Sequence, residues 1–268
     1  MSQTHRIAML AIAASCCSCA LGQHPGDINP TLHPGGGGFA KILTGVINAE
    51  GEQESDVRVF ECAFGDSGFP EFTSNPGFDA VPGTFQAGTR VGFHVPDGFY
   101  RWDGTSPSLV TDERLDISYF TLAVTVGPAP NEGFDLAVQS NGGWHRHLSF
   151  SIGNESGGNA PPGIYVLPLV LYSTDRMVVA SEPFWLVFNY LSNQTEQDAA
   201  TAWVHEHWVS PFCIADTDFD GSVGAPDIAN LLGAWGPAAA TGFGDFNGDG
   251  LVGASDLAVL LGAWGSCP

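Results

Sequence analysis

The sequence predicts a mainly β protein, an antiparallel β-sandwich followed by a small C-terminal α module. Glycine and proline are abundant, with 35 Gly and 18 Pro, while only 14% of the residues are charged. Short apolar runs are separated by Pro-Gly, Asn-Gly and Gly-Gly signals, which is typical of antiparallel strands joined by turns. After residue 212 the pattern changes to one unit written twice, each copy with apolar residues at helical spacing.

Residues 1–22 have the features of a secretory signal peptide. The start is weakly positive, Ile7–Leu21 carries no charge, and Ala20-Leu21-Gly22 has the small-x-small pattern of a cleavage site. The apolar run is shorter than a membrane span needs. We therefore expect an exported protein, secreted or attached to the cell surface, with no membrane span in the mature chain. A lipoprotein with lipid on Cys16 is the rival interpretation, but the Leu usual three residues before such a cysteine is missing.

Residues 23–208 form the predicted β-sandwich domain, which is long enough to bury a full core. Thr195–His205 is polar and then apolar at helical spacing, so we expect a helix there with Ser192 or Asn193 as its N-cap. Residues 209–212 are a short linker that contains Ser210-Pro211. The candidate strands are Phe39–Asn48, Asp56–Ala63, Arg90–His94, Leu115–Val126, Gly133–Val138, His145–Ile152, Gly163–Tyr172 and Met177–Tyr190.

The stretch Ile164–Leu171 is nearly all apolar. A continuous apolar run of this length indicates a strand that is buried on both faces. Pro168 interrupts the run, and proline cannot donate a hydrogen bond to a neighbouring strand. It therefore indicates a sheet edge or a bulge at this point.

The C-terminal module, residues 213–268, contains two copies of a calcium-binding loop, which begin at Asp216 and Asp245. Such a loop needs oxygen ligands at positions 1, 3, 5 and 12, a backbone carbonyl at 7 and glycine at 6. Hard oxygen ligands at this spacing suit Ca²⁺, whereas Mg²⁺ gives up its waters reluctantly. Position 12 is Asp in both copies, which is one methylene shorter than the Glu of a standard EF-hand, so each helix must begin close to its ion. The predicted ligands of the two Ca²⁺ ions are Asp216, Asp218, Asp220, Ser222 and Asp227 in loop one, and Asp245, Asn247, Asp249, Leu251 and Asp256 in loop two.

Each loop is followed by a predicted short helix that carries one apolar stripe and ends at Gly236 or Gly265. Two such helices can bury their stripes against each other, but a module this short is marginal without further links. Cys213 and Cys267 bracket the pair, and a disulfide between them would contribute about 4 kcal/mol. The stripes are Ile228, Leu231, Leu232 and Trp235, and Leu257, Leu260, Leu261 and Trp264.

The two loop-plus-helix units, with Asp at position 12 and no helix before the first loop, resemble a type I dockerin module. The resemblance covers residues 213–268 and implies a cohesin-like partner on the cell surface or in the cell envelope. Dockerins bind through loop positions 10 and 11, here Ala225-Pro226 and Ala254-Ser255, and through the helix that follows. Cellulosomal dockerins have hydroxyl pairs there, so we expect a different partner. The rival interpretation is a calcium-stabilised cap that binds no partner.

The charge of the chain argues against some classes of partner, and its cysteine count predicts one free thiol. The chain has 29 acidic and 8 basic residues and a net charge of −21, which argues against binding to nucleic acid or to an anionic membrane surface. The C-terminal module holds seven Asp and no Lys or Arg, so it is suited to cations. Three cysteines remain after the signal peptide, and an odd number leaves one unpaired. We expect Cys62 to be the buried free one.

Histidines supply the candidate chemistry of the main domain. His145 and His147 stand at i and i+2, and on a strand they would share one face, which is a typical spacing of metal ligands. His205 and His207 form a second such pair near the end of the predicted helix, where i and i+2 point apart. Imidazole together with carboxylate suits Zn²⁺ or a similar transition metal. Two ligands do not make a site, and the further possible ligands are His24, Asp27, His33 and His94.

The motif H-x-H-x-x-F at His145, followed by P-G-x-Y at Pro162 and an apolar strand, resembles a bacterial surface-anchored domain family. Shorter matches begin at Asn75, Trp102 and Ser181, and the similarity spans residues 24–208. Members of this family end in many different anchors, and some are associated with zinc regulation or metal uptake. The resemblance implies a surface domain that handles metal.

Signals for an enzyme are weak. Gly65-Asp66-Ser67-Gly68 resembles the serine motif of chymotrypsin-like proteases, but the rest of that pattern is missing, so we interpret it as a turn. Dockerins often accompany polysaccharide-degrading enzymes, which makes a carbohydrate-binding or polysaccharide-degrading protein the alternative. Phe99, Tyr100 and Trp102 could stack on sugars or fill the core. The predicted function is a non-enzymatic surface protein that is tethered through its calcium module.

Overall fold

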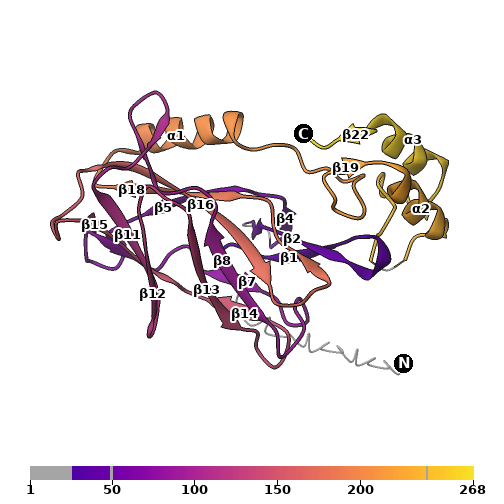
Figure 1. The fold of residues 1–268 in the computed structure, drawn as a ribbon, viewed down its shortest axis with the longest axis horizontal. Helices are drawn as coiled ribbons and strands as arrows, with labels where there is room; N and C mark the ends of the chain where they lie inside the picture. Colours follow the sequence, from indigo (N-terminus) through magenta and orange to yellow (C-terminus); the bar gives the residue numbers. More distant parts are fainter. Residues whose placement is uncertain (1–25, 49–50, 240) are drawn as a thin grey trace, which may run out of the picture.

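The computed structural model describes residues 26–48, 51–239 and 241–268. The predicted signal peptide, residues 1–22, lies outside these ranges, as does His24. Figure 1 shows a β-rich body with one helix lying over it and a smaller group of elements at the C-terminal end. The described residues contain three α-helices, α1 (Gln194–His207), α2 (Ala225–Gly233) and α3 (Ala254–Gly262), and a short 3-10 helix η1 (Gly36–Gly38).

The protein is mainly β, as predicted, with several antiparallel sheets. Two strand pairs in these sheets are parallel and join Val59–Ala63 to Phe184–Tyr190 and Val178–Val179 to Ala40–Leu43. The strands are β1 (Thr31–Pro34), β2 (Ala40–Leu43), β3 (Gly45–Ile47), β4 (Gln53–Ser55), β5 (Val59–Ala63), β6 (Phe72–Thr73), β7 (Phe78–Ala80), β8 (Arg90–Val95), β9 (Tyr100–Trp102), β10 (Pro107–Leu109), β11 (Glu113–Tyr119), β12 (Leu122–Val126), β13 (Asn131–Ala137), β14 (Trp144–Arg146), β15 (Ser149–Asn154), β16 (Gly163–Ser173), β17 (Val178–Val179), β18 (Phe184–Tyr190), β19 (Ser222–Val223), β20 (Gly236–Pro237), β21 (Leu251–Val252) and β22 (Gly265–Ser266).

Strand β16 is the centre of the largest sheet. It pairs with β18 along one side and with β9 and then β8 along the other. Its odd-numbered residues face the main core, which β11 and β15 also line, and its even-numbered residues face a smaller cluster under α1. The strand is therefore buried on both faces, as its continuous apolar run predicts. The odd-numbered set is Tyr165, Leu167, Leu169 and Leu171, and the even-numbered set is Ile164 and Val166.

Pro168 lies inside this central strand, so the expectation of a sheet edge at this point is wrong for the strand as a whole. Its partner on β18 is Trp185, whose N–H donates to Arg58 on the far side. Pro168 N therefore faces away from β18. There, β16 changes partner between Val166, paired with β9, and Val170, paired with β8. The missing donor falls in this gap, which is why a proline is tolerated.

Four predicted strands are each divided in the structure. Phe39–Asn48 becomes β2 and β3, and Met177–Tyr190 becomes β17 and β18. Leu115–Val126 is the hairpin β11–β12, which turns at Phe120 with φ 52° and 91% exposure. The sequence has no Gly, Pro or Asn at that turn, so the usual signal is missing. His145–Ile152 is split between β14 and β15, which belong to different sheets. Period-2 patterns do not show where a strand changes sheet.

Helix α1 confirms the predicted helix and extends it by a residue or two at each end. Asn193 caps it, because its side chain accepts a hydrogen bond from Glu196 N at 3.0 Å. Both histidines of the second H-x-H pair lie within the helix. The ring of His207 stacks on Trp203, with the two centroids 4.3 Å apart. Within the described residues, none of the helices combines the length and apolar character that crossing a bilayer demands.

Because of the buried Tyr165, we expect the folded protein to lose stability measurably in alkali. Its hydroxyl donates to Pro161 O at 2.6 Å, and burial raises the pKa of Tyr165 to about 12. The folded state keeps the phenol neutral above pH 10, where an unfolded chain ionises it, so stability falls as pH rises from about 10 to about 12. We expect the free energy of unfolding to drop by about 1.4 kcal/mol more in the wild type than in Tyr165→Phe between pH 9 and 11. Denaturant titrations at the two pH values measure this, and equal drops would contradict it.

The C-terminal elements form a cross-connected pair. Position seven of each loop, Ser222 or Leu251, begins a short strand, and that strand pairs with the residues that follow the other helix. The disulfide between Cys213 and Cys267 closes the module, as predicted, with Cα atoms 5.8 Å apart. A small core lies between the helices and consists of Ala215, Val223, Leu231, Val252 and Leu260.

The helices α2 and α3 are shorter than predicted. They end at Gly233 and Gly262, three residues before the expected glycines, and Gly236 and Gly265 begin strands instead. Trp235 and Trp264 lie beyond the helix ends, and Leu232 and Leu261 lie within the helices but are exposed, so the apolar stripes are only half buried. The half-exposed members are Leu232, Trp235, Leu261 and Trp264.

Candidate metal-binding sites

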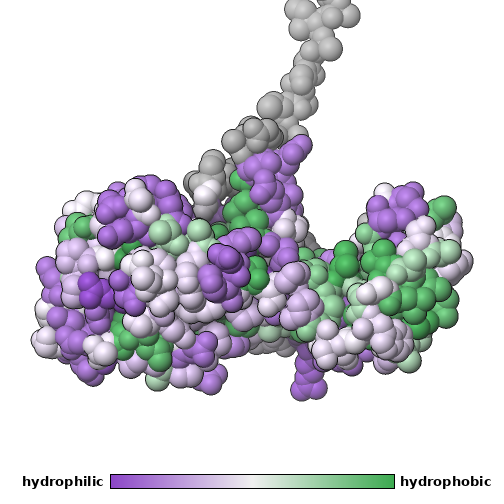
Figure 2. All heavy atoms as spheres, turned by 90° about the horizontal axis from the view of Figure 1, so that it is seen from above, coloured by the Kyte–Doolittle hydropathy of each residue, from purple (hydrophilic) through white to green (hydrophobic). Residues whose placement is uncertain are grey.

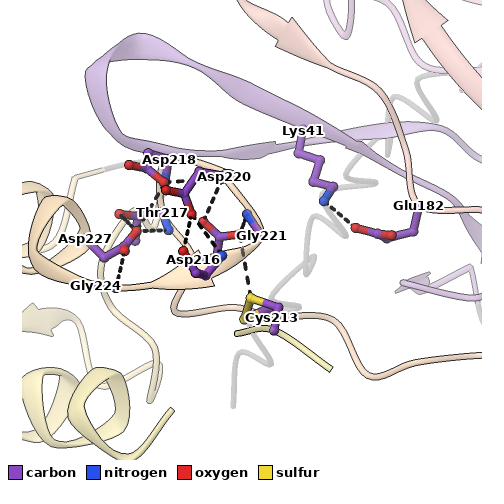
Figure 3. The surroundings of a disulfide bond; sticks show 12 residues. Lys41, Glu182, Cys213, Asp216, Thr217, Asp218, Asp220, Gly221, Gly224 and Asp227 are labelled. Carbon is purple, nitrogen blue, oxygen red and sulfur yellow. Dashed lines mark hydrogen bonds and ion pairs between the residues drawn. A yellow bond between two sulfur atoms is a disulfide. The ribbon is translucent and has the colours of Figure 1, made fainter. Parts of the chain in front are cut away.

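Loop one gathers three carboxylates. One oxygen from each of Asp216, Asp218 and Asp220 lies within 4.8 Å of the others, and Figure 3 shows them within one loop. Backbone amides hold Asp216, because Asp220 N donates to its Oδ1 at 3.2 Å and Gly221 N donates to its Oδ2 at 2.9 Å. Burial and then the charges of Asp227 and Asp220 raise the pKa of Asp218. A bound cation would neutralise the like charges that contribute to this shift.

Loop two repeats this geometry bond for bond. Asp249 N donates to Asp245 Oδ1 at 3.1 Å, and Gly250 N donates to Oδ2 at 2.8 Å. Position six has φ near +87° in both copies, 88° at Gly221 and 86° at Gly250, a conformation that glycine adopts readily. Asn247 stands where loop one has an aspartate, so loop two carries one negative charge fewer. The structure thus brings together the side chains predicted at positions 1, 3 and 5.

The aspartates at position 12, Asp227 and Asp256, hold each loop against its helix. Asp227 Oδ2 accepts from Gly224 N at 2.7 Å, and its Oδ1 accepts from Thr217 N at 2.7 Å. Asp256 makes the equivalent bonds. Burial alone would raise the pKa of Asp256, but its backbone hydrogen bonds lower it. The carboxylate of Asp256 is therefore kept ionised at the N-terminus of α3, where negative charge is stabilised.

An exposed apolar surface covers the same module. Figure 2 shows hydrophobic residues gathered over the C-terminal end of the molecule. Contiguous exposed apolar surface of this kind commonly marks an interaction site. Ala225, Pro226, Ala254 and Ser255, which carry loop positions 10 and 11, are also exposed at the starts of α2 and α3.

The β1–β2 hairpin packs against loop one. Gly36 N donates to Thr217 O at 2.6 Å, and a Cβ added to Gly35 would lie 2.7 Å from that same oxygen. The ring of Phe219 covers Gly35. The backbone of Phe219 has φ 60°, a strained value for a bulky residue. Loop two has Gly248 at the equivalent position, with φ 72°. The hairpin contact explains why loop one carries a large side chain where the loop backbone suits glycine.

Two hairpin side chains add to this contact. Lys41 Nζ lies 5.6 Å from the ring centroid of Phe219 and also pairs with Glu182 of the body, as Figure 3 shows. The ring of His33 lies edge-on to that of Phe212, with the centroids 5.1 Å apart. Burial and then the charge of Lys41 lower the pKa of His33, so its imidazole is neutral at pH 7 and does not repel Lys41.

A second group of ligand atoms lies in the body. One atom from each of Asp27, His145 and His147 falls within 4.8 Å of the others. His147 Nε2 is 3.2 Å from His145 Nε2 and 3.5 Å from Asp27 Oδ2. His145 lies on β14, opposite Asp79 of β7, but His147 lies one residue beyond the end of the strand. The histidines therefore meet, as predicted, but not by sharing one strand face. Asp79 was not predicted, because only the pairing of β7 with β14 brings it near.

The aromatic residues considered for sugar binding have mixed positions. Phe99 is fully buried and stacks on Tyr165, so the core interpretation holds for it. Trp102 packs edge-on against Trp203 of α1. A groove of about 330 Å³ does lie at the end of α1, with Pro96, Asp97, Tyr100, Pro168, Pro183, Trp185, His207 and Trp208 along its walls.

Cys62 and Ser67 carry potentially nucleophilic side chains in the body. Cys62 is buried and is free among the described residues, as expected. Burial raises the pKa of Cys62 well above its ordinary value, so the thiol stays protonated and unreactive. Ser67 is exposed within a turn that includes Gly65, with φ 90°, which agrees with the interpretation of this stretch as a turn.

No protein-family model matches the chain, and no curated protein matches it. The strongest functional observations are therefore its two groups of converging ligand atoms. One group lies in loop one of the C-terminal module, and the other joins Asp27 to the segment that carries His145 and His147.

Proposed function

We propose that this chain is a secreted or cell-surface, non-enzymatic protein. In this proposal its body, a β-sandwich, is tethered to a cohesin-like partner through a calcium-dependent, dockerin-like C-terminal module. The observation that carries the proposal is the bond-for-bond duplication of the two acidic loops, each followed by a helix that its own position-12 aspartate caps.

Calcium fits these loops better than other common cations. Their side chains offer carboxylate and amide oxygens, and the glycine at position six allows the sharp turn that a calcium loop requires. Ca²⁺ accepts six to eight oxygen ligands in flexible geometry, whereas Mg²⁺ demands near-ideal octahedral geometry and retains waters. Bound ions would neutralise the crowded carboxylates and so fix each loop to the helix that follows it.

The exposed apolar face supports a protein partner for the module. Leu232 and Trp235 on one repeat, and Leu261 and Trp264 on the other, are each about half exposed. Apolar and aromatic residues of this kind are enriched in the centres of protein interfaces. Since the module contains acids and no Lys or Arg, we expect the partner surface to be apolar with a basic rim.

Binding of a polysaccharide is the second candidate. The groove at the end of α1 places Tyr100, Trp185 and Trp208 beside the carboxylate of Asp97. Aromatic rings next to a hydrogen-bonding group are suited to stacking on sugar rings. Screening on a glycan array, together with a Trp208→Ala variant, tests it, and absence of any glycan signal would remove this candidate.

Calorimetric titration with Ca²⁺ tests the proposed function. We expect two sites in the wild type, and we expect Asp216→Ala combined with Asp245→Ala to weaken both by on the order of 100-fold or more, because each substitution removes a charged ligand. Asp103→Ala is the matched control. Asp103 also accepts backbone bonds in an exposed turn, from Thr105 and Ser106, but it belongs to the body. Unchanged calcium uptake in the double variant would refute the loop assignment.

A further inference from the structure

The spacing of Asp27, His145 and His147 matches the ligand sphere of one metal ion. A transition metal bound at about 2.0–2.1 Å in tetrahedral geometry keeps its ligand atoms about 3.3 Å apart. The Nε2 atoms of the two histidines are 3.2 Å apart, and His147 Nε2 is 3.5 Å from Asp27 Oδ2. Two of the three separations therefore match those around a single shared ion, and all three atoms lie within 4.8 Å of one another.

Asp27 provides evidence that does not depend on the histidine spacing. Its side chain is 6% exposed, and within the described part of the chain Oδ2 has no hydrogen-bond partner. Oδ1 accepts from Gly77 N at 2.9 Å, which fixes the carboxylate with Oδ2 on the side of His147. A buried carboxylate oxygen without a donor is costly. A cation bound among these atoms would offset that cost.

Neighbouring groups fix the orientation of both imidazoles. His147 Nδ1 lies 3.1 Å from Ser74 O, and because a carbonyl can only accept, Nδ1 carries the hydrogen. His145 Nδ1 lies 3.5 Å from Asp79 Oδ1, and that carboxylate favours the same tautomer. Both Nε2 lone pairs are then directed to the group, which is the usual arrangement around a metal. Gly77 leaves room for the His147 ring, since a Cβ there would lie 2.7 Å from Nε2.

We propose that Asp27, His145 and His147 form a three-ligand site for a divalent transition metal ion such as Zn²⁺. Two imidazoles and one carboxylate are the donor set of zinc sites that keep an open coordination position. Asp27 and His147 also line a cavity of about 450 Å³, which includes Glu61 and Asp66. Its acidic wall attracts hydrated cations and repels anions. The site is therefore suited to capturing metal rather than to acting on an anionic substrate.

Calorimetry of the full-length protein, saturated with Ca²⁺ and titrated with Zn²⁺, tests this proposal. We expect one Zn²⁺ site, and we expect His145→Ala combined with His147→Ala to weaken it at least 100-fold. Asp79→Asn should weaken it roughly 10- to 100-fold, because this residue orients a ligand without binding the metal. Co²⁺ in place of Zn²⁺ should give visible absorption bands of a low-coordinate site, and the histidine variant should lose them.

The control is His205→Ala combined with His207→Ala, which removes two histidines from α1 and should leave Zn²⁺ binding unchanged. Far-UV circular dichroism verifies that each variant is folded. Gly77→Ala is a second test of the metal site, because it displaces the His147 ring and keeps all three ligands. Equal Zn²⁺ affinity in folded wild type and His145→Ala/His147→Ala would overturn the proposal, as would loss of the site in the α1 control. A failed Zn²⁺ titration with normal Ca²⁺ uptake refutes this site and leaves the proposed tether intact.

Discussion

Chelation of calcium from the full-length protein is expected to unfold α2 and α3 and to leave the β-rich body intact. Loop one crowds three carboxylates within 4.8 Å. Two like charges 4 Å apart repel by about 1 kcal/mol in water and about 4 kcal/mol at an effective dielectric constant of 20. The core between the helices has five buried apolar residues, which is too few to order such a module without a further link.

Hydrogen exchange measures this unfolding residue by residue. We expect exchange of the amides in α2 and α3 to accelerate by on the order of 100-fold or more in chelator, with the disulfide reduced so that it does not hold the module together. The amides of β16 and β18 serve as the internal control, because their sheet contains no part of the acidic loops. If α2 and α3 stay protected after chelation and reduction, the calcium dependence proposed for this module is wrong.

The second large effect is expected from Gly35→Val, which should separate the β1–β2 hairpin from loop one. Gly35 has φ −117°, so valine suits the backbone, but its Cβ would lie 2.7 Å from Thr217 O and would overlap the ring of Phe219. The hydrogen bond from Gly36 N to Thr217 O is then lost. Small-angle X-ray scattering should show a larger radius of gyration, and exchange at the Gly36 amide should accelerate to that of an exposed turn.

Two further variants make this result specific. Gly233→Ala is the matched control, because a Cβ there meets nothing within 4 Å and so introduces no clash. Phe219→Gly gives loop one the residue that loop two has at Gly248. It should keep calcium binding while the hairpin amides lose protection. Unchanged scattering and exchange in Gly35→Val would show that the hairpin contact does not hold the module against the body.

Features that depend on short spacings were predictable. The ligands of each loop fall within twelve residues, and the structure brings positions 1, 3 and 5 together in both copies. Helix α1 and its cap at Asn193 follow from the same kind of local pattern. The helix ends were wrong by three residues, because Gly236 and Gly265 adopt positive φ at the start of strands. A glycine in the sequence indicates that the chain changes direction, but the surrounding structure decides whether a helix ends there or a strand begins.

Local sequence patterns were enough to predict a mainly β chain, two acidic loops with their helices, and the cysteine pair that closes the module. In each case the interacting groups are close along the chain or, for Cys213 and Cys267, they bracket the duplicated unit. The meeting of Asp27 with His145 and His147 depends on tertiary contacts, because Ile28 bridges to Phe78 of β7 and β7 pairs with β14. The tertiary structure also decided why Phe219 occupies a glycine position, since the hairpin that stabilises it lies far away in the sequence. Contacts of this kind depend on strand register and docking, which no local pattern specifies.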